Sequence, residues 1–284
     1  MLNVFPALAA TPFLLASIGP ALAAPIDAMD AIRPHRAVYD MTLGNVAEGS
    51  DLATLSGRLA YDLQGTLCEG FSVNFRLVTR FANRNGDETT TDLRSATFED
   101  LLTRGDAEDR FRFLTSNIVN RVASAETDGV AARLDGAVEV TLKKPEEADL
   151  VLPGDVLFPT EHLAALIEAA RNGVRVFPAR IYDGSEDGAT VNETTAVIGA
   201  RAVREDADFP ALEGRTYWPV TLSYFEEGAT GDLLPEYEIS FDLFENGVSD
   251  VLTLDYGEFS VEGSLATLEM PDTQPSEPDA CPPD

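Results

Sequence analysis

Apolar and polar residues alternate with a period of two through much of the chain, and this pattern constrains the fold more than any other feature of the sequence. In residues 54–64 one face carries apolar or small side chains and the other carries polar ones. Residues 71–81 and 236–244 repeat the pattern, and Asn246-Gly247 then marks a tight hairpin. Because successive strand side chains point to opposite faces, the pattern predicts antiparallel strands with one buried and one solvent-facing side.

Weaker strand patterns extend this prediction to most of the remaining chain. They lie at residues 37–43, 89–98, 109–115, 138–142, 174–182, 190–198, 217–225, 250–256 and 259–268. Glycines and turn residues separate them at short intervals, which is typical of a sandwich or a barrel-like sheet. No internal repeat, linker or shift in composition divides the chain, so we expect a single, mostly β domain over residues 24–284.

One segment has helical periodicity. Thr160 is the expected N-cap after Pro159, and Gly173 is expected to end the helix. Apolar side chains recur between them at helical spacing, at Leu163, Leu166, Ile167 and Ala170. We therefore predict a short helix over residues 161–171, and we expect its apolar stripe to pack on the sheet and not on a partner protein.

The first residues have the composition of an export signal. The chain stays apolar or small through Ala24, and its first ionisable side chain is Asp27. Ala21-Leu22-Ala23 has the small-x-small pattern of a cleavage site, although no Lys or Arg precedes the apolar core. We expect residues 1–23 to be a signal peptide and the exported chain to have no membrane-spanning segment, because no second long apolar run follows.

The chain is strongly acidic. Asp and Glu total 49 against 20 Lys and Arg, giving a formal net charge of −29. Such a charge repels phosphate backbones, so we expect no nucleic acid partner, and it also disfavours adhesion to anionic membrane. The simplest interpretation of the acidity is solubility.

Two cysteines, Cys68 and Cys281, occur in the sequence. An even count in an exported protein suggests a disulfide, although free thiols or metal ligands are the alternatives. Neither cysteine has a second Cys or a His at metal-ligand spacing, so we expect no metal site here. Cys281 lies in a proline-rich tail, residues 271–284, which a bridge to Cys68 would tie back to the body of the protein.

Catalytic motifs are not evident. The chain contains no Gly-x-Ser-x-Gly, no phosphate-binding glycine loop and no His-Glu-x-x-His sequence. Its two histidines, His35 and His162, have the sequence contexts of packing or surface residues more than of general bases. We therefore expect neither an enzyme nor a bound cofactor.

Residues 183–188 resemble the first half of a calcium loop. Oxygen-bearing side chains stand at Asp183, Ser185 and Asp187, followed by Gly188. Position twelve of a calcium loop should supply a bidentate acid, but here it is Thr194. The sequences on both sides of the segment also have the pattern of strands instead of helices. Because Asp-Gly pairs are common in hairpins, we predict a turn here and not a calcium site.

Several ordered motifs resemble the EipB-like cell-envelope integrity proteins of alphaproteobacteria. The Cys-Glu-Gly sequence that begins at Cys68 is one of them. The matching segments are residues 35–40, 68–76, 158–162, 181–188, 217–220 and 254–259, and the likeness runs from about His35 to Leu268. The strong acidity departs from the family pattern and puts any shared charged docking surface in doubt.

The resemblance implies a periplasmic protein whose long antiparallel sheet is coiled into a spiral with one small helix. It implies a disulfide between Cys68 and Cys281, and a role in envelope integrity exercised together with a periplasmic tetratricopeptide-repeat protein. It supplies no catalytic residues.

Two functions follow as hypotheses. The first is a non-enzymatic protein that acts by protein–protein interaction, and the second is a carrier for an apolar envelope component such as a lipid or lipid-linked glycan. A curved sheet with many inward apolar residues could enclose a cavity for such a ligand, or those residues could simply fill the core. The candidate interaction or cavity residues are His35, Tyr39, Phe71, Phe75, His162 and Trp218.

Overall fold

The computed structural model describes residues 26–101, 110–225 and 234–271. The predicted signal peptide, residues 1–23, lies outside the described residues. So does Cys281, together with the proline-rich tail beyond Pro271.

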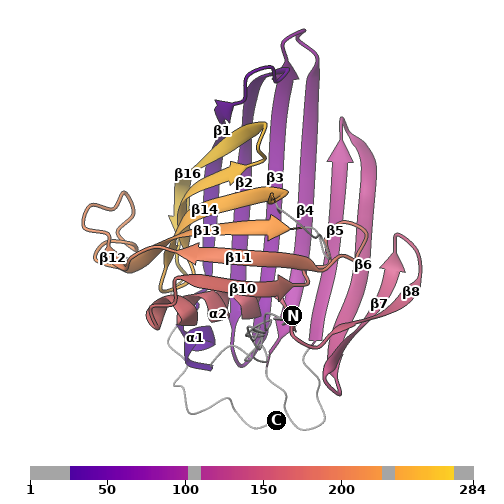
Figure 1. Ribbon diagram of the computed structural model, residues 1–284, viewed down its shortest axis with the longest axis vertical. Helices are drawn as coiled ribbons and strands as arrows, with labels where there is room; N and C mark the ends of the chain where they lie inside the picture. The colour runs from indigo at the N-terminus through magenta and orange to yellow at the C-terminus, as the bar shows by residue number, and fades with distance from the viewer. Residues whose placement is uncertain (1–25, 102–109, 226–233, 272–284) are drawn as a thin grey trace, which may run out of the picture.

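Sixteen strands and two helices occupy the described ranges (Figure 1). The helices are α1 (Ile26–Ala31) and α2 (Pro159–Arg171). The strands of the first half are β1 (His35–Val46), β2 (Leu52–Thr66), β3 (Gly70–Asn83), β4 (Glu88–Asp100), β5 (Arg110–Val119), β6 (Val122–Leu134), β7 (Ala137–Lys144) and β8 (Ala148–Pro153). Those of the second half are β9 (Val156–Leu157), β10 (Val176–Ile181), β11 (Asn192–Ile198), β12 (Ala202–Val203), β13 (Thr216–Phe225), β14 (Tyr237–Phe244), β15 (Ser249–Asp255) and β16 (Phe259–Glu269).

All these strands belong to one sheet that curls on itself. Its order runs from β8 down to β1, then from β16 back through β15, β14, β13, β11 and β10 to β9, with β12 paired to β13. β8 and β9 are therefore the two ends of the sheet, yet only two residues separate them in the chain. The long strands β1–β6 form a rear wall, and β10, β11 and β13–β16 cross in front of it (Figure 1). The predicted long antiparallel sheet of spiral or barrel-like form is confirmed.

The register agrees with the predicted faces. Leu59 of β2 lies between Tyr39 of β1 and Leu77 of β3, and all three side chains point to the concave side of the sheet. Their polar neighbours in sequence face solvent, as shown by Arg58, which pairs with Asp40 on the outer surface. The alternation in residues 54–64 and 71–81 therefore marks real inner and outer faces.

Four strands and one helix lack a matching prediction. The inward positions of β6 are occupied by Thr127, Gly129 and Ala131, so this strand has little apolar alternation to detect. β8 is six residues long, and β9 and β12 have two residues each, too few to establish a period. Helix α1 is similarly short.

Helix α2 is confirmed, but its predicted N-cap is wrong. The N-cap residue is Phe158, and the helix begins at Pro159. Glu161 accepts a hydrogen bond from the Phe158 backbone N–H at 3.2 Å. Thr160 lies inside the first turn instead of at the cap. The carboxylate of Glu99 on β4 accepts from the backbone N–H groups of Thr160 and Glu161, which would otherwise be free at the helix start.

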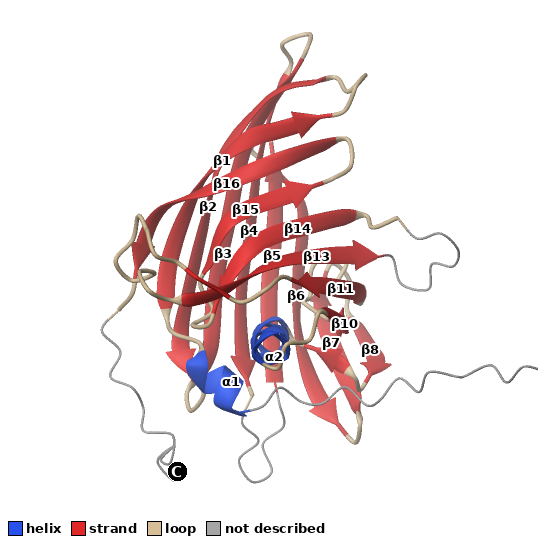
Figure 2. Cartoon of the chain, turned by 60° about the vertical axis from the view of Figure 1, so that its left-hand side comes forward, coloured by secondary structure: helices blue, strands red, loops and turns tan. Residues whose placement is uncertain are grey.

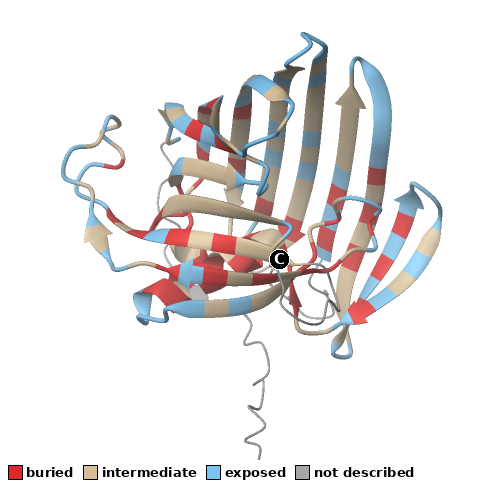
Figure 3. Cartoon of the chain, turned by 45° about the horizontal axis from the view of Figure 1, so that its top comes forward, coloured by how far each residue is buried: buried red, intermediate tan, exposed pale blue. Residues whose placement is uncertain are grey.

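The main core lies where the helices meet the sheet. Helix α2 lies between the front and rear walls near one end of the curl (Figure 2), and its expected packing on the sheet is confirmed. Leu166 and Ile167 are buried there in one cluster with Trp218 and Leu243 of the front wall. Figure 3 shows that buried residues concentrate toward this end, whereas the far tips of the long strands are exposed.

Candidate functional site

A cavity of about 680 Å³ lies between the front and rear walls. Strands β1–β6 contribute one side of it, β14 and β15 contribute the other, and the first turn of α2 forms part of its boundary. Because the sheet curls around this space, side chains from the inner faces of strands far apart in sequence meet there.

Most of the lining is apolar. Tyr39 and Leu59 lie beside Phe75 on the rear wall, and Ile239, Phe241 and Leu252 face them from the front. We call these six residues the apolar side of the cavity. Their arrangement follows from the period-two pattern, since each occupies the inward position of its strand.

A polar stripe crosses the remaining part of the rear wall. We define the polar arc as five inward-facing side chains of β4–β6, namely Ser95, Thr97, Thr115, Asn117 and Thr127. Ser95 pairs with Thr115, and Thr115 in turn pairs with Thr127, so the arc runs straight across three neighbouring strands. The Thr115 hydroxyl donates to Ser95 Oγ at 3.3 Å. The cavity is therefore amphipathic.

A second cavity of about 510 Å³ adjoins the first. The two share Leu93 and Asn117 in their linings. Asn117 of the polar arc therefore stands at the junction of two compartments. The second compartment is bounded largely by apolar side chains of β1–β3, β15 and β16, including Met41, Leu77 and Val261.

The structure brings three of the six candidate residues into the first cavity: His35, Tyr39 and Phe75. The Tyr39 hydroxyl donates to the backbone carbonyl of Ser249 at 2.6 Å, and burial raises its pKa well above the usual range. His35 lies over the Tyr61 ring with centroids 5.4 Å apart. Burial lowers the pKa of His35, so its imidazole is neutral at pH 7.

The other three candidates, Phe71, His162 and Trp218, are buried away from the cavity lining. Phe71 and Trp218 belong to the core around α2. Burial lowers the pKa of His162 to about 4, and its Nε2 atom has no hydrogen-bond partner among the described residues. His162 packs against Phe177 with ring centroids 6.0 Å apart, which is the arrangement of a core residue.

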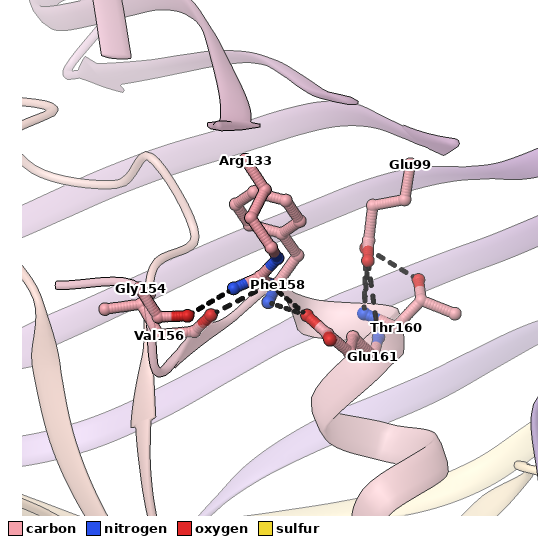
Figure 4. Close-up of polar contacts among 7 residues, drawn as sticks. All are labelled: Glu99, Arg133, Gly154, Val156, Phe158, Thr160 and Glu161. Atoms are coloured by element: carbon pink, nitrogen blue, oxygen red, sulfur yellow. Dashed lines mark hydrogen bonds and ion pairs between the residues drawn. The ribbon is translucent and has the colours of Figure 1, made fainter. Parts of the chain in front are cut away.

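Sequence reasoning missed Glu99, a buried carboxylate at the start of α2 (Figure 4). Its oxygens accept hydrogen bonds from the backbone N–H and hydroxyl of Thr160 at 2.7 to 3.0 Å, and from the Glu161 N–H at 3.3 Å. Burial raises the pKa of Glu99 to about 7, against the opposing effect of these donors. No sequence signal distinguishes it from the other acidic residues of the chain.

Arg133 of β6 was also missed, and it holds the same end of the helix (Figure 4). Its guanidinium donates to the carbonyls of Gly154 and Val156 at 2.6 and 3.0 Å, and to Glu161 Oε2 at 2.9 Å. It also lies 5.4 Å from the centre of the Phe158 ring. One side chain therefore connects β6, the segment joining β8 to β9, and the start of α2, which borders the cavity.

The loop between β10 and β11 forms another boundary of the cavity. Asp183 Oδ1 accepts from the Ser185 N–H at 2.9 Å, and a turn follows at residues 186–187, as predicted. The Thr127 hydroxyl donates to the Glu186 carbonyl at 2.6 Å, so the loop is fastened to β6. Gly184 has φ 66°, and a Cβ there would lie 2.3 Å from Phe113, so the close approach requires glycine.

Three further expectations concern a disulfide, metal sites and membrane-spanning segments. Cys68 lies in the turn between β2 and β3, and because Cys281 is outside the described residues, the disulfide stays a prediction. Within the described ranges, no group of three or more His, Cys, Asp or Glu side chains is arranged to hold a metal ion. None of the helices in those ranges is long and apolar enough to cross a membrane.

Comparison with known proteins places this architecture in a family. Residues 26–272 match the model of the EipB-like family. The chain is 39% identical over 252 residues to the cell envelope integrity protein EipB of Brucella abortus (strain 2308), covering 87% of this chain and 88% of that protein. A crystal structure described as a beta-barrel-like protein of a domain of unknown function, also from Brucella abortus, superposes with a TM-score of 0.78 at 37% identity. It covers 85% of this chain and 99% of its own. The protein therefore belongs to the EipB-like family.

Proposed function

We propose that this protein contributes to cell-envelope integrity in the periplasm by binding an apolar or amphiphilic envelope component in the cavity inside its curled sheet. The envelope role rests on the name of the Brucella relative. The binding role rests on one observation, the cavity of about 680 Å³ bounded by the apolar side and the polar arc.

The size and lining of the cavity support this function. Protein interiors are close-packed, and voids larger than a water molecule are few. Sites for small ligands have volumes of roughly 300–1,000 Å³ and are mostly apolar with a few polar groups. Each methylene group of a ligand transferred from water into such a site contributes about 0.8 kcal/mol. A hydrocarbon chain is therefore the ligand that this lining favours.

A substitution that fills the cavity tests the proposal. Ile239→Trp adds an indole to the apolar side, and we expect it to abolish binding of the apolar fluorophore N-phenylnaphthylamine, which the wild type should bind with enhanced fluorescence. Val122→Trp is the matched control, because Val122 is 68% exposed and does not line the cavity. Equal fluorescence enhancement in wild type and the Ile239→Trp variant would exclude the cavity as the binding site.

Docking of a periplasmic tetratricopeptide-repeat protein is the second candidate function, and the free edge of β8 favours it. Among the described residues this strand pairs only with β7, and Val151 is 73% exposed on it. An exposed strand edge can accept a strand from another chain. We expect Val151→Pro to reduce co-purification of such a partner from envelope extract. Unchanged co-purification would exclude this edge.

A further inference from the structure

We infer that the cavity selects an amphiphile whose headgroup is uncharged and hydroxylated, and that Ser95 and Asn117 of the polar arc bind this headgroup. The inference rests on the proposed function and adds the ligand's chemical class. It is carried by the charges around the two compartments and by the hydrogen-bonding capacity that the polar arc leaves unused.

The charges exclude an anionic headgroup. Neither compartment has a Lys or Arg side chain in its lining. His35, the one histidine there, is neutral at pH 7 because burial lowers its pKa. Asp183 and Glu186 of the β10–β11 loop border the first compartment, whereas the carboxylate of Glu126 lies on the outer face of β6. A phosphate, sulfate or carboxylate placed there would lose its hydration, gain no cation and lie near the two carboxylates of Asp183 and Glu186.

The same carboxylates do not form a cage for a cation, because each already has a partner. Glu126 Oε2 pairs with Lys144 Nζ at 2.8 Å. Asp183 Oδ1 accepts from the Ser185 N–H at 2.9 Å, and Glu186 Oε2 accepts from the Thr190 hydroxyl at 3.3 Å. These contacts direct the acidic groups toward the protein's own donors. The charges therefore exclude an anionic headgroup, and the hydrogen-bonding groups of the polar arc decide between a cationic and an uncharged one.

The polar arc offers one donor and one acceptor side by side. Ser95 Oγ accepts from Thr115, which leaves the Ser95 hydroxyl proton to donate to a ligand. Asn117 Oδ1 is buried and has no hydrogen-bond partner among the described residues, so it can accept from a ligand once the side-chain amide rotates toward the cavity. These two residues are diagonal neighbours on the inner face, since Leu93 pairs with Asn117 and Ser95 with Thr115. Hydroxyl groups both donate and accept, so adjacent hydroxyls of a sugar-like headgroup complement this pair.

The position of the pair also suits an amphiphile. Asn117 belongs to both linings, so a headgroup held there has an apolar compartment on either side for its hydrocarbon chain. Thr127 of the same arc is already committed to the Glu186 carbonyl. We therefore assign headgroup recognition to Ser95 and Asn117 and not to the whole arc.

Three surfactants with one chain length and different headgroups provide the test, each used below its micelle-forming concentration. Calorimetric titration of the full mature protein should show dodecyl maltoside binding about tenfold or more tightly than dodecyl phosphate or dodecyltrimethylammonium. Asn117→Leu should weaken dodecyl maltoside binding about five- to tenfold, the loss of roughly one hydrogen bond. It should leave binding of N-phenylnaphthylamine, which has no such headgroup, unchanged. Asn74→Leu, on the outer face of β3, is the matched control.

Two outcomes overturn the inference separately from the proposed function. If N-phenylnaphthylamine binds but dodecyl phosphate or dodecyltrimethylammonium binds as tightly as the maltoside, the headgroup assignment is wrong while the binding function stands. If the maltoside is preferred but Asn117→Leu and Ser95→Ala leave its affinity unchanged, the preference arises elsewhere. If neither the fluorophore nor any surfactant binds, the proposed function fails, and the inference fails with it.

Discussion

Glu99 shows how one side chain can couple protonation to the position of a helix. Its carboxyl group lies against the first N–H groups of α2, where the helix dipole and three donors favour the ionised form. Complete burial favours the neutral form more strongly and raises the pKa to about 7. The first turn of the helix borders the cavity through Pro159 and Thr160. Glu99 therefore holds a proton-dependent contact with a segment that borders the cavity.

This raised pKa predicts a pH-dependent stability. The folded-state pKa of about 7 exceeds the ordinary value of 4.5. The contribution of Glu99 is therefore full below about pH 4.5 and is lost as the pH rises through about 7. Relative to Glu99→Gln, the wild type should lose about 3 kcal/mol of unfolding free energy between about pH 5 and about pH 8.

Urea unfolding of both proteins across this range is the measurement. The buried histidines His35 and His162 titrate with the opposite sign, since their pKa values are lowered, but they are common to both proteins and cancel in the comparison. A difference in stability that does not change with pH would show that Glu99 has an ordinary pKa.

At the level of strands and helices, Arg133 is one of the contacts that close the curl, together with Thr127 on the β10–β11 loop and Glu99 on α2. β8 and β9 are the two ends of the sheet order, and no ladder joins them among the described strands. The Arg133 guanidinium donates to the Gly154 carbonyl in their connection, to the Val156 carbonyl at the start of β9 and to the Glu161 carboxylate at the start of α2. The ion pair between Arg133 and Glu161 is mostly buried, with side-chain exposures of 22% and 6%. It holds together elements that the backbone ladder leaves separate.

We predict that Arg133→Met destabilises the fold by about 3–5 kcal/mol, because it removes the cation from a buried carboxylate. The double variant Arg133→Met/Glu161→Gln should recover a large part of this loss. Arg58→Met breaks an exposed pair with Asp40 and should change the unfolding free energy by less than about 1 kcal/mol. Chemical denaturation compares all three. A loss below about 1 kcal/mol for Arg133→Met would mean that the curl is closed by other contacts.

The predicted disulfide acts at the same scale, between the β2–β3 turn and the chain's C-terminal segment. If Cys68 is bridged to Cys281, Cys68→Ser should lower stability by about 2–5 kcal/mol with little change in far-ultraviolet circular dichroism, since the bridge mainly restricts the unfolded chain. Proteolysis beyond residue 270 should become faster. Thermal melting compared under oxidising and reducing conditions is the check, and an unchanged melting temperature with unchanged cleavage would contradict the bridge.

For the whole molecule, the sequence predicts the strands better than it predicts the space they enclose. Period-two alternation locates β2 and β3, because the inward positions of each strand carry mostly apolar side chains. It fails for β6, because the inner face of this strand has small and polar residues. One of them, Thr127, forms part of the cavity lining. Alternation predicts which side chains face inward. It does not predict whether the front and rear walls of the sheet pack against each other or leave a cavity, because that depends on how the sheet curls.

The candidate site was predictable to a similar extent. His35, Tyr39 and Phe75 reach the cavity because they occupy inward strand positions beside recognisable motifs. Ser95 and Asn117 escape detection because single polar residues at inward positions resemble breaks in a strand pattern. Their proximity depends on the register between β4 and β5, which makes Ser95 and Asn117 neighbours although they are more than twenty positions apart in the sequence.

Native mass spectrometry of the protein shows directly whether the curled sheet holds a ligand. The mature protein should be isolated from envelope extract without detergent, as wild type, Ile239→Trp and Val122→Trp. We predict that wild type and Val122→Trp carry an additional mass of an amphiphile, which the Ile239→Trp variant lacks because the indole occupies its site. A wild-type protein found only at the mass of its polypeptide, or an adduct retained in full by Ile239→Trp, would show that the cavity is not the site of a bound amphiphile.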